Sequence, residues 1–354
     1  MTPAELSRTV LRAVRRAVDE DVLRAPVPTH VRVERTRPGG SGDYACAVAL
    51  QLSGPAALPA REVAALLRDR VAGVPGIGRV EITGPGFLNF TLDASADADA
   101  RAARVRQVLE QGLRYGWGTE CAGETHQLHH RPEVRAAVVA GAVRELLRAQ
   151  GARVRTTCEE APDPDWTRLG VTVDAYGRPP SPLTETRPVP AGATASELLG
   201  RLGADATLWG LLRPAGHDRA LLGDDLLVQG EANPLFLVRY AHARARALIR
   251  GAERLGFDAA YEEDVDAPAL HAAIADHPGV LAAAARHQAP DRLARQLETV
   301  ADAFLDFHGN RPPLPVGDEK PSVAHRSRLA LAEAAGTVLA GGLSLLGISA
   351  PEHL

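Results

Sequence analysis

Residues 233–251 read Asn-Pro-Leu-Phe-Leu-Val-Arg-Tyr-Ala-His-Ala-Arg-Ala-Arg-Ala-Leu-Ile-Arg-Gly and predict a helix with both ends marked. Asn233 can cap the N-terminus because its side chain accepts a hydrogen bond from a free backbone N–H. Pro234 stands at the first helical position, where the N–H that proline lacks would have no helical partner. Gly251 fits the residue that ends a helix. The stretch therefore predicts one helix over residues 234–250.

The predicted helix has an apolar face and a cationic face. The residues that recur at helical spacing and can face a core are Leu237, Ala241, Ala245 and Leu248. On another stripe, Arg239, Arg246 and Arg250 are separated by seven and by four residues, so they share one side of the helix. The helix therefore offers one side to a protein core and another to an anionic partner.

The same stretch resembles the first helix of the anticodon-binding (DALR) domain of arginyl-tRNA synthetases, in which an Asn-Pro start and a Tyr-Ala-His-Ala-Arg core recur. The matching residues here are Asn233, Pro234 and 240–244. Residues 345–352, Leu-Leu-Gly-Ile-Ser-Ala-Pro-Glu, resemble the C-terminus of that family. The resemblance implies a helical anticodon-binding domain over residues 231–354. It also implies that Tyr240 and Arg244 contact the anticodon loop of tRNA, with core packing as the alternative for Tyr240.

Composition sets further bounds. A chain of 354 residues has the length of two or three domains. The net charge of −4 counts mildly against a nucleic-acid partner, although a local cationic face is enough for binding. Cys46, Cys121 and Cys158 lie far apart without metal-type spacing, which fits a reducing cytoplasm. The sequence has no apolar run of membrane-spanning length and no signal-peptide pattern. Lys320 is the only lysine, which excludes any mechanism that needs a lysine elsewhere.

Residues 1–93 predict a small α/β domain with helices on one face of an antiparallel sheet. The predicted helices are 4–24, 46–52 and 59–73, and the predicted strands are 31–35, 79–83 and 87–92. Residues 84–90, Gly-Pro-Gly-Phe-Leu-Asn-Phe, resemble the N-terminal additional domain of arginyl-tRNA synthetases, which contacts the D-loop side of tRNA. The resemblance implies that Asn89 and Phe90 contact tRNA, with sheet packing as the alternative for Phe90. Residues 94–118 are assigned to a linker with a helix over 97–115.

Residues 119–230 occupy the place of the catalytic Rossmann domain of the family, which is far longer. In the family that domain opens with a strand, a His-x-Gly-His loop and a helix whose N-terminus faces the ATP phosphates. Residues 134–150 predict this helix, so the signature position reads His130-Arg131-Pro132-Glu133. His130 keeps the first histidine, but Glu133 places an acid where phosphates would lie, which is repulsive. We interpret His130 and Glu133 as a degenerate remnant without catalytic residues.

The second signature of the family is a mobile loop whose lysine neutralises pyrophosphate. Its place is residues 187–192, Arg-Pro-Val-Pro-Ala-Gly, which hold no lysine. The segment between the two signatures is shortened to residues 156–183, so space for an amino acid and ATP is mostly missing. His126, His129 and His130 lie close together in sequence but lack the pattern of a zinc motif. No metal and no cofactor is therefore predicted.

From residue 231 onward the pattern predicts a helical bundle. The predicted helices after the first are 266–275, 278–287, 290–308 and 322–346. His308 stands where the family commonly has a tyrosine able to stack on a base, and Leu354 stands where a terminal methionine is frequent. At these two positions the chain departs from the family pattern of anticodon contact.

The sequence as a whole predicts an α+β, multidomain fold: a small N-terminal α/β domain, a shortened Rossmann-like remnant and a C-terminal helical anticodon-binding bundle. We interpret the chain as a non-catalytic, cytoplasmic tRNA-binding protein with a regulatory or accessory role. Arg239, Arg246 and Arg250 would hold phosphates, and Tyr240 and Asn89 would add base contacts.

The family suggests arginine tRNA as the partner, and no membrane or DNA partner is expected. Two alternatives stay open. One is a residual ligase that acylates tRNA with ATP, favoured only by the surviving first histidine. The other is a protein-interaction module, with a protein partner, that no longer binds RNA.

Overall fold

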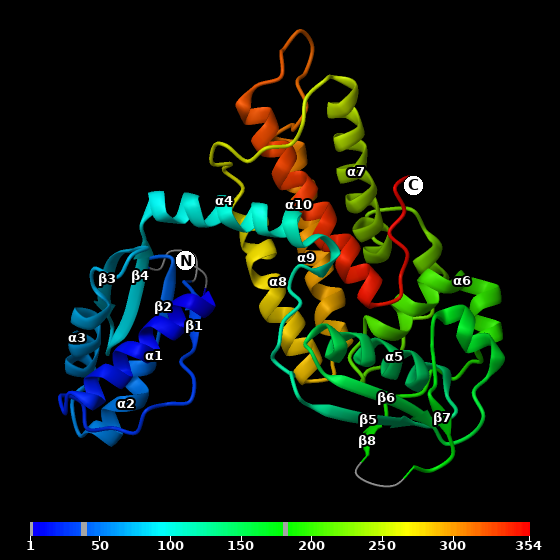
Figure 1. The fold of residues 1–354 in the computed structure, drawn as a ribbon, viewed down its shortest axis with the longest axis horizontal. Helices are drawn as coiled ribbons and strands as arrows, with labels where there is room; N and C mark the ends of the chain where they lie inside the picture. The colour runs from blue at the N-terminus through cyan, green and yellow to red at the C-terminus, as the bar shows by residue number, and fades with distance from the viewer. Residues whose placement is uncertain (1–2, 37–40, 180–182) are drawn as a thin grey trace. The chain divides into compact units, whose positions relative to one another are not determined.

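The computed structural model describes residues 3–36, 41–179 and 183–354 (Figure 1). The chain divides into two compact units, residues 1–103 and 104–354, which we call the N-terminal unit and the C-terminal unit. Helix α4 (Ala94–Gln111) contains the point of division. Among the described residues, no helix combines the length and the apolar character that crossing a membrane requires.

The N-terminal unit holds a four-stranded sheet in the order β1-β2-β4-β3, in which every pairing is antiparallel, as predicted. Its elements are α1 (Pro3–Asp19), β1 (Val33–Arg35), β2 (Tyr44–Cys46), α2 (Val48–Ala56), α3 (Ala60–Val71), β3 (Ile77–Thr83) and β4 (Phe87–Leu92). Helix α1 is shorter than predicted because Asp21 adopts a positive φ of 53°. The N–H groups of Val22 and Leu23 then both donate to the carbonyl of Ala17.

The core of the N-terminal unit lies between its helices and one face of the sheet. The α1 residues without exposed surface are Leu6, Val10, Val14 and Ala17. From β4, Leu88 and Phe90 point to the same face because alternate residues of a strand share a side, and both are fully buried. They form one apolar cluster with residues of α2 and α3. Burial of this apolar surface holds one side of α1 against the core. The other side of the helix faces solvent.

The C-terminal unit begins with a parallel sheet in the order β7-β6-β5-β8. Strand β5 (Thr125–His130), helix α5 (Val134–Ala149) and strand β6 (Arg153–Cys158) form a β-α-β crossover, and β5 and β6 pair in parallel along their whole lengths. Strands β7 (Ala175–Tyr176) and β8 (Thr184–Thr186) flank them. This is the Rossmann-like arrangement predicted for the remnant, with two edge strands of only two and three residues. Residues 180–182 of the shortened segment lie outside the described residues.

Short helical segments connect this sheet to the rest of the C-terminal unit. They are η1 (Gly112–Arg114), η2 (Pro164–Leu169), α6 (Ala195–Leu212) and η3 (Asp224–Leu227). The sequence pattern predicts two short helices between residues 196 and 227, the second around residues 205–212. Both lie within α6, on either side of a kink at Gly203, where φ is +75°. Thr194 and Glu197 form a capping box that fixes the start of α6.

The rest of the C-terminal unit is the predicted bundle of helices, shown in Figure 1: α7 (Pro234–Arg254), α8 (Pro268–Arg286), α9 (Pro290–Asn310) and α10 (Val323–Leu345). Gly251 does not end α7, contrary to the prediction. The helix continues to Arg254, and the left-handed glycine is Gly256, with φ of +74°. Gly251 is instead a packing position, since a Cβ there would lie 2.7 Å from Cδ1 of Leu314.

The sequence pattern also predicted two helices where the structure has only α8. The predicted helices, 266–275 and 278–287, are divided next to Pro278, and a proline inside a helix lacks a backbone donor. In the structure α8 runs through Pro278, and the carbonyl of Ile274, four residues earlier, accepts a hydrogen bond from the Tyr115 hydroxyl at 3.1 Å. A side chain distant in sequence thus satisfies the carbonyl that the proline leaves free.

His277, beside this proline, should make the stability of the C-terminal unit depend on pH. It is 2% exposed and stacks on Tyr115, and burial lowers its pKa to about 4. In the unfolded chain His277 binds a proton near pH 6.5, whereas in the folded chain it stays neutral down to about pH 4. The free energy of unfolding therefore decreases as the pH falls through this range. We expect the free energy of unfolding to drop about 2 kcal/mol more in the wild type than in His277→Phe between pH 7 and pH 5, measured by urea titration. An equal drop in both proteins would contradict this assignment.

Candidate functional site

The predicted signature position lies at the end of β5 and the start of α5, as the sequence indicates. His130 is the last residue of β5, and Glu133 is the N-cap of α5. One oxygen of the Glu133 carboxylate accepts a hydrogen bond from the N–H of Ala136 at 2.9 Å. The other accepts from the N–H of Ala191 at 2.8 Å. The positive end of α5, where an anion would otherwise bind, is therefore filled by a carboxylate of the chain itself.

His130 is enclosed rather than presented to a ligand. It is 2% exposed, and its ring lies 5.7 Å from the ring of Trp166. Its Nδ1 lies 2.9 Å from the carbonyl oxygen of Arg131, while Nε2 is buried without a hydrogen-bond partner among the described residues. Burial, the largest cause, lowers its pKa and favours the neutral ring.

The loop at the place of the second signature is fastened to the first turn of α5. The side chain of Arg135 is fully buried, and its guanidinium group donates to five backbone carbonyls. The acceptors are the oxygens of Val189, Leu211, Pro214, Ala215 and Asp218, at 2.6–3.2 Å. Together with the contact between Glu133 and Ala191, these bonds hold residues 189–191 against the helix N-terminus. The two signature positions are thus in direct contact through Glu133 and Ala191.

The histidines near β5 do not assemble a metal site. His129 bonds through Nδ1 to the hydroxyl of Thr157 at 2.9 Å, and His126 bonds through Nε2 to the carboxylate of Glu124 at 2.8 Å. Within residues 3–36, 41–179 and 183–354, no group of three or more histidine, cysteine, aspartate or glutamate side chains could hold a metal ion. The only lysine, Lys320, lies in the segment between α9 and α10.

The start of α7 is built as the sequence predicts. The Oδ1 atom of Asn233 accepts hydrogen bonds from the N–H groups of Leu235 and Phe236, and its amide group donates to the carbonyls of Leu226 and Val228. Asn233 thus caps α7 and ties it to η3 at the same time. A cap of this kind contributes about 1 kcal/mol.

The predicted RNA-binding residues of α7 separate onto two sides of the helix. Arg239, Arg246 and Arg250 form one stripe, and the C-terminal segment runs along it (Figure 1). The carboxylate of Glu352 lies 3.0 Å from Arg246 and 3.7 Å from Arg250. Arg239 lies 3.4 Å from the carboxylate of Asp205. Acids of the chain itself therefore neutralise the stripe that was predicted to hold phosphates.

The other side of α7 carries Tyr240 and Arg244, one turn apart. Tyr240 is 40% exposed and stacks on Phe236, with ring centres 5.7 Å apart. Arg244 is exposed, and its Nε donates to Nε2 of His308 at 3.1 Å. Burial, and then the charge of Arg244, lower the pKa of His308, so its ring stays neutral. This side offers an aromatic face and a guanidinium group together, which suits a stacked base and a phosphate.

Both predicted contact residues of the N-terminal unit, Asn89 and Phe90, are buried in the structure. Phe90 is fully buried and serves the core, which was the alternative for it. Asn89 points to the opposite face of the sheet but is only 5% exposed, and its amide donates to the hydroxyl of Thr83 at 2.5 Å. Phe87, at the start of β4, is 37% exposed. A direct RNA contact by Phe90 is therefore wrong for this conformation, because the side chain has no surface to offer.

Two residues of the candidate site were missed in the sequence. Arg135 resembles a solvent-exposed arginine of an amphipathic helix, and nothing local shows that five carbonyls surround it. Glu352 was noted only as part of the C-terminal resemblance. Its partners Arg246 and Arg250 are 106 and 102 residues away, so no sequence spacing indicates the pairing.

Two family models match parts of this chain. A family model of the DALR anticodon binding domain matches residues 238–354, and a model of the arginyl tRNA synthetase N terminal domain matches residues 5–92. The chain is 27% identical to an arginine–tRNA ligase of Frankia alni and 25% identical to one of Renibacterium salmoninarum, with all of both chains covered in each case. The first alignment extends over 552 positions, although this chain has 354 residues.

Solved structures show the same fold. The arginyl-tRNA synthetase of Thermus thermophilus superposes with a TM-score of 0.72 at 14% identity, with both chains covered completely. The arginyl-tRNA synthetase of Plasmodium falciparum gives a TM-score of 0.71 at 9% identity, with 99% of each chain covered. At these identities the likeness concerns the fold alone. The chain thus shares the fold of these proteins.

Proposed function

The chain belongs to the arginyl-tRNA synthetase family, and we propose that it is a member that binds tRNA without catalysing aminoacylation. Its four proposed parts are residues 1–93 as the additional domain, 94–118 as a linker, 119–230 as a catalytic-domain remnant and 231–354 as the anticodon-binding domain. The observation that carries the proposal is the Glu133 carboxylate, which fills the N-terminus of α5 and bonds to the loop at the second signature position.

The charge at the N-terminus of α5 disfavours nucleotide binding. A nucleotide phosphate bound there would meet a carboxylate in place of free N–H donors, so the attraction of the helix dipole is cancelled by repulsion. No lysine lies in residues 187–192 to neutralise pyrophosphate. The nearby Arg135 donates its hydrogen bonds to backbone carbonyls instead. The gaps implied by an alignment of 552 positions for a chain of 354 residues support the same proposal, because a shortened catalytic domain would produce them.

Binding of tRNA is supported by the anticodon-binding domain match and by the exposed side of α7. Tyr240 and Arg244 present a stacking face and a cation next to each other. Arg246 and Arg250 of the stripe can hold phosphates once Glu352 moves away. We propose arginine tRNA as the partner because the family relation favours it, and a regulatory or accessory role because the site for chemistry is filled.

A salt series of tRNA binding tests this function. We expect the full chain to retain tRNA from a total cellular pool at low salt, and retention to weaken steeply as salt rises, since arginine–phosphate contacts release counterions. Sequencing of the retained RNA should show enrichment of arginine tRNAs. Arg244→Gln should weaken retention, whereas Arg148→Gln, an exposed arginine of α5, should not. Absence of retention at low salt would contradict the proposal and favour a module that contacts protein.

A residual ligase is the second candidate, since His130 keeps the first signature histidine. It predicts exchange of pyrophosphate into ATP in the presence of an amino acid. We expect no exchange above background with arginine or any other amino acid, with or without tRNA. Exchange that disappears in His130→Ala would overturn the non-catalytic assignment, because a filled helix N-terminus cannot hold the ATP phosphates.

A further inference from the structure

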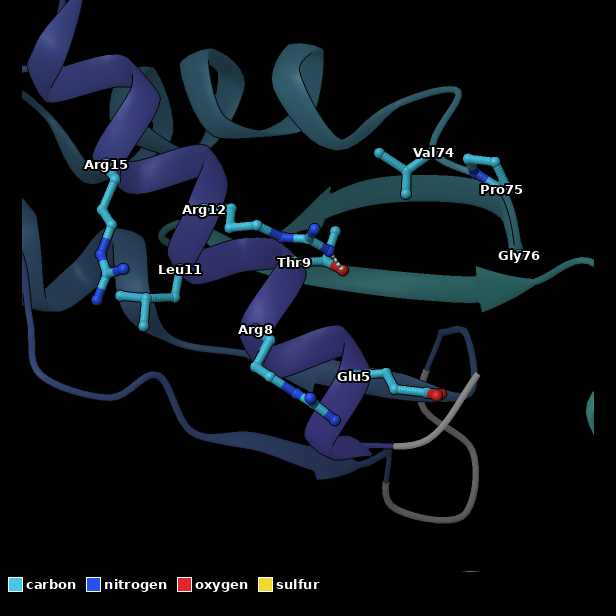
Figure 2. A pocket seen from close by; sticks show the side chains of 9 residues that line it. All are labelled: Glu5, Arg8, Thr9, Leu11, Arg12, Arg15, Val74, Pro75 and Gly76. Carbon is cyan, nitrogen blue, oxygen red and sulfur yellow. Dashed lines mark hydrogen bonds between the residues drawn. The ribbon is translucent and has the colours of Figure 1, made fainter. Parts of the chain in front are cut away.

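A groove in the N-terminal unit carries a concentration of positive charge that the proposed function does not use. Figure 2 shows its lining: residues of α1 on one side and the turn of Val74, Pro75 and Gly76 before β3 on the other. Three arginines and one glutamate line it, namely Arg8, Arg12, Arg15 and Glu5. All four charged side chains come from α1.

The arginines are held as a row by the fold. Arg8, Arg12 and Arg15 follow one another at intervals of four and three residues, so they lie on neighbouring turns of α1. At a rise of about 1.5 Å per residue, the row is about 10 Å long. The opposite face of α1 is locked in the core, since Leu6, Val10 and Val14 have no exposed surface. The row is therefore presented to solvent without freedom to turn inward.

Two of the three arginines are not neutralised by a carboxylate. Arg12 donates to the hydroxyl of Thr9 at 3.2 Å, and that group is uncharged. Within the part of the chain that the structure describes, Arg15 has no hydrogen-bond or ion-pair partner. Arg8 and Glu5 each interact with other groups of the chain, so neither is counted among the free charges. This differs from the α7 stripe, where Glu352 neutralises Arg246 and Arg250.

The chemistry of the row favours a phosphate chain over the other anionic surfaces. A guanidinium group donates two parallel hydrogen bonds to a phosphate, and successive arginines on a straight helix meet successive phosphates of a strand. Insertion into a membrane surface would require α1 to bury its apolar face in lipid, but that face is already packed in the core. The lining holds no exposed aromatic side chain to stack a base, so the contact would be independent of sequence.

We propose that this α1 groove is a second RNA-binding surface, which takes the phosphodiester backbone through Arg12 and Arg15. The identity of the RNA as tRNA rests on the proposed function, whereas the groove itself does not depend on α7. It is also separate from Asn89 and Phe90, which are buried.

The test compares the full chain with Arg12→Gln/Arg15→Gln and with Arg16→Gln. Arg16 is an exposed arginine of the same helix that does not line the groove, so it controls for the loss of charge from α1. Binding of total tRNA is measured from low to high salt for each protein. We expect the double variant to reduce the slope of log affinity against log salt by about 1.5, and Arg16→Gln to leave it unchanged. Circular dichroism and thermal unfolding show that each variant is folded.

The outcomes separate this inference from the proposed function. Wild-type retention with an unchanged slope in the double variant would overturn the groove and leave the proposed function standing. If the wild type does not retain tRNA, the proposed function fails, and polyuridylate is then used as the probe. Polyuridylate binding that needs Arg12 and Arg15 would support the groove, and no binding would overturn it. Binding to vesicles of anionic phospholipid that needs both arginines, without RNA binding, would overturn the assignment to RNA.

Discussion

Replacing Arg135 with methionine should lower the free energy of unfolding of the C-terminal unit by about 3–5 kcal/mol. The guanidinium group is fully buried and donates to five carbonyls of residues 189–218. Methionine fills a similar volume but has no donor, so five carbonyls lose their side-chain partner, and those of Leu211 and Pro214 lie in a buried place. Each such group costs about 1–3 kcal/mol when it stays unsatisfied, and partial relaxation of the loops lowers the total.

Urea unfolding followed by circular dichroism measures this effect. Arg148→Met is the matched control, because Arg148 also lies on α5 but is 42% exposed and pairs only with Glu145 on the surface. We expect its change to stay within about 0.5 kcal/mol. Hydrogen exchange adds a second readout: amides of residues 187–191 and 211–218 should lose protection in Arg135→Met. Equal stability of the two variants would mean that the loops are held by other contacts.

Replacing Arg246 and Arg250 together with glutamine should weaken tRNA binding about tenfold or more at low salt and lower the salt slope by about 1.5. Both lie on the arginine stripe of α7 that is proposed to hold phosphates, and both contact Glu352. Arg239 is left unchanged because it contacts Asp205 and Ser349, so its loss would also disturb the C-terminal segment. Arg254→Gln, in the last turn of α7, is the control.

Glu352→Gln should act in the opposite direction. Its carboxylate competes with phosphate for Arg246 and Arg250, and exposed ion pairs of this kind are worth about 0–1 kcal/mol. Removal of the charge should therefore strengthen tRNA binding by up to about fivefold. Weaker binding in Glu352→Gln would show that the arginines serve to hold the C-terminal segment in place rather than to bind RNA. Filter binding at fixed salt distinguishes the two results.

Much of the fold follows from patterns that act over a few residues. Asn233 caps α7 as predicted, because the capping side chain reaches only the next two or three N–H groups. The antiparallel sheet of the N-terminal unit and the strand, loop and helix around His130 also agree with the sequence. The substitution of Glu133 at the signature position is visible in the sequence without any structure.

The errors arose where a distant part of the chain changes a local rule. Pro278 predicts the end of a helix, but the hydroxyl of Tyr115 satisfies the carbonyl that the proline leaves free. Gly251 predicts a helix end, but its missing Cβ makes space for Leu314. In both places the local signal is sound, and a contact between segments far apart in sequence overrides it.

The sequence by itself determined the family, the main helices and strands and the presence of an arginine stripe on α7. Only the tertiary structure decided which charges are free. It places Glu352 on Arg246 and Arg250, surrounds Arg135 with carbonyls and, among the described residues, brings no acid to Arg12 or Arg15. The physical reason is that periodicity and capping depend on near neighbours, whereas the state of a charged group depends on whatever the folded chain brings within a few ångströms of it.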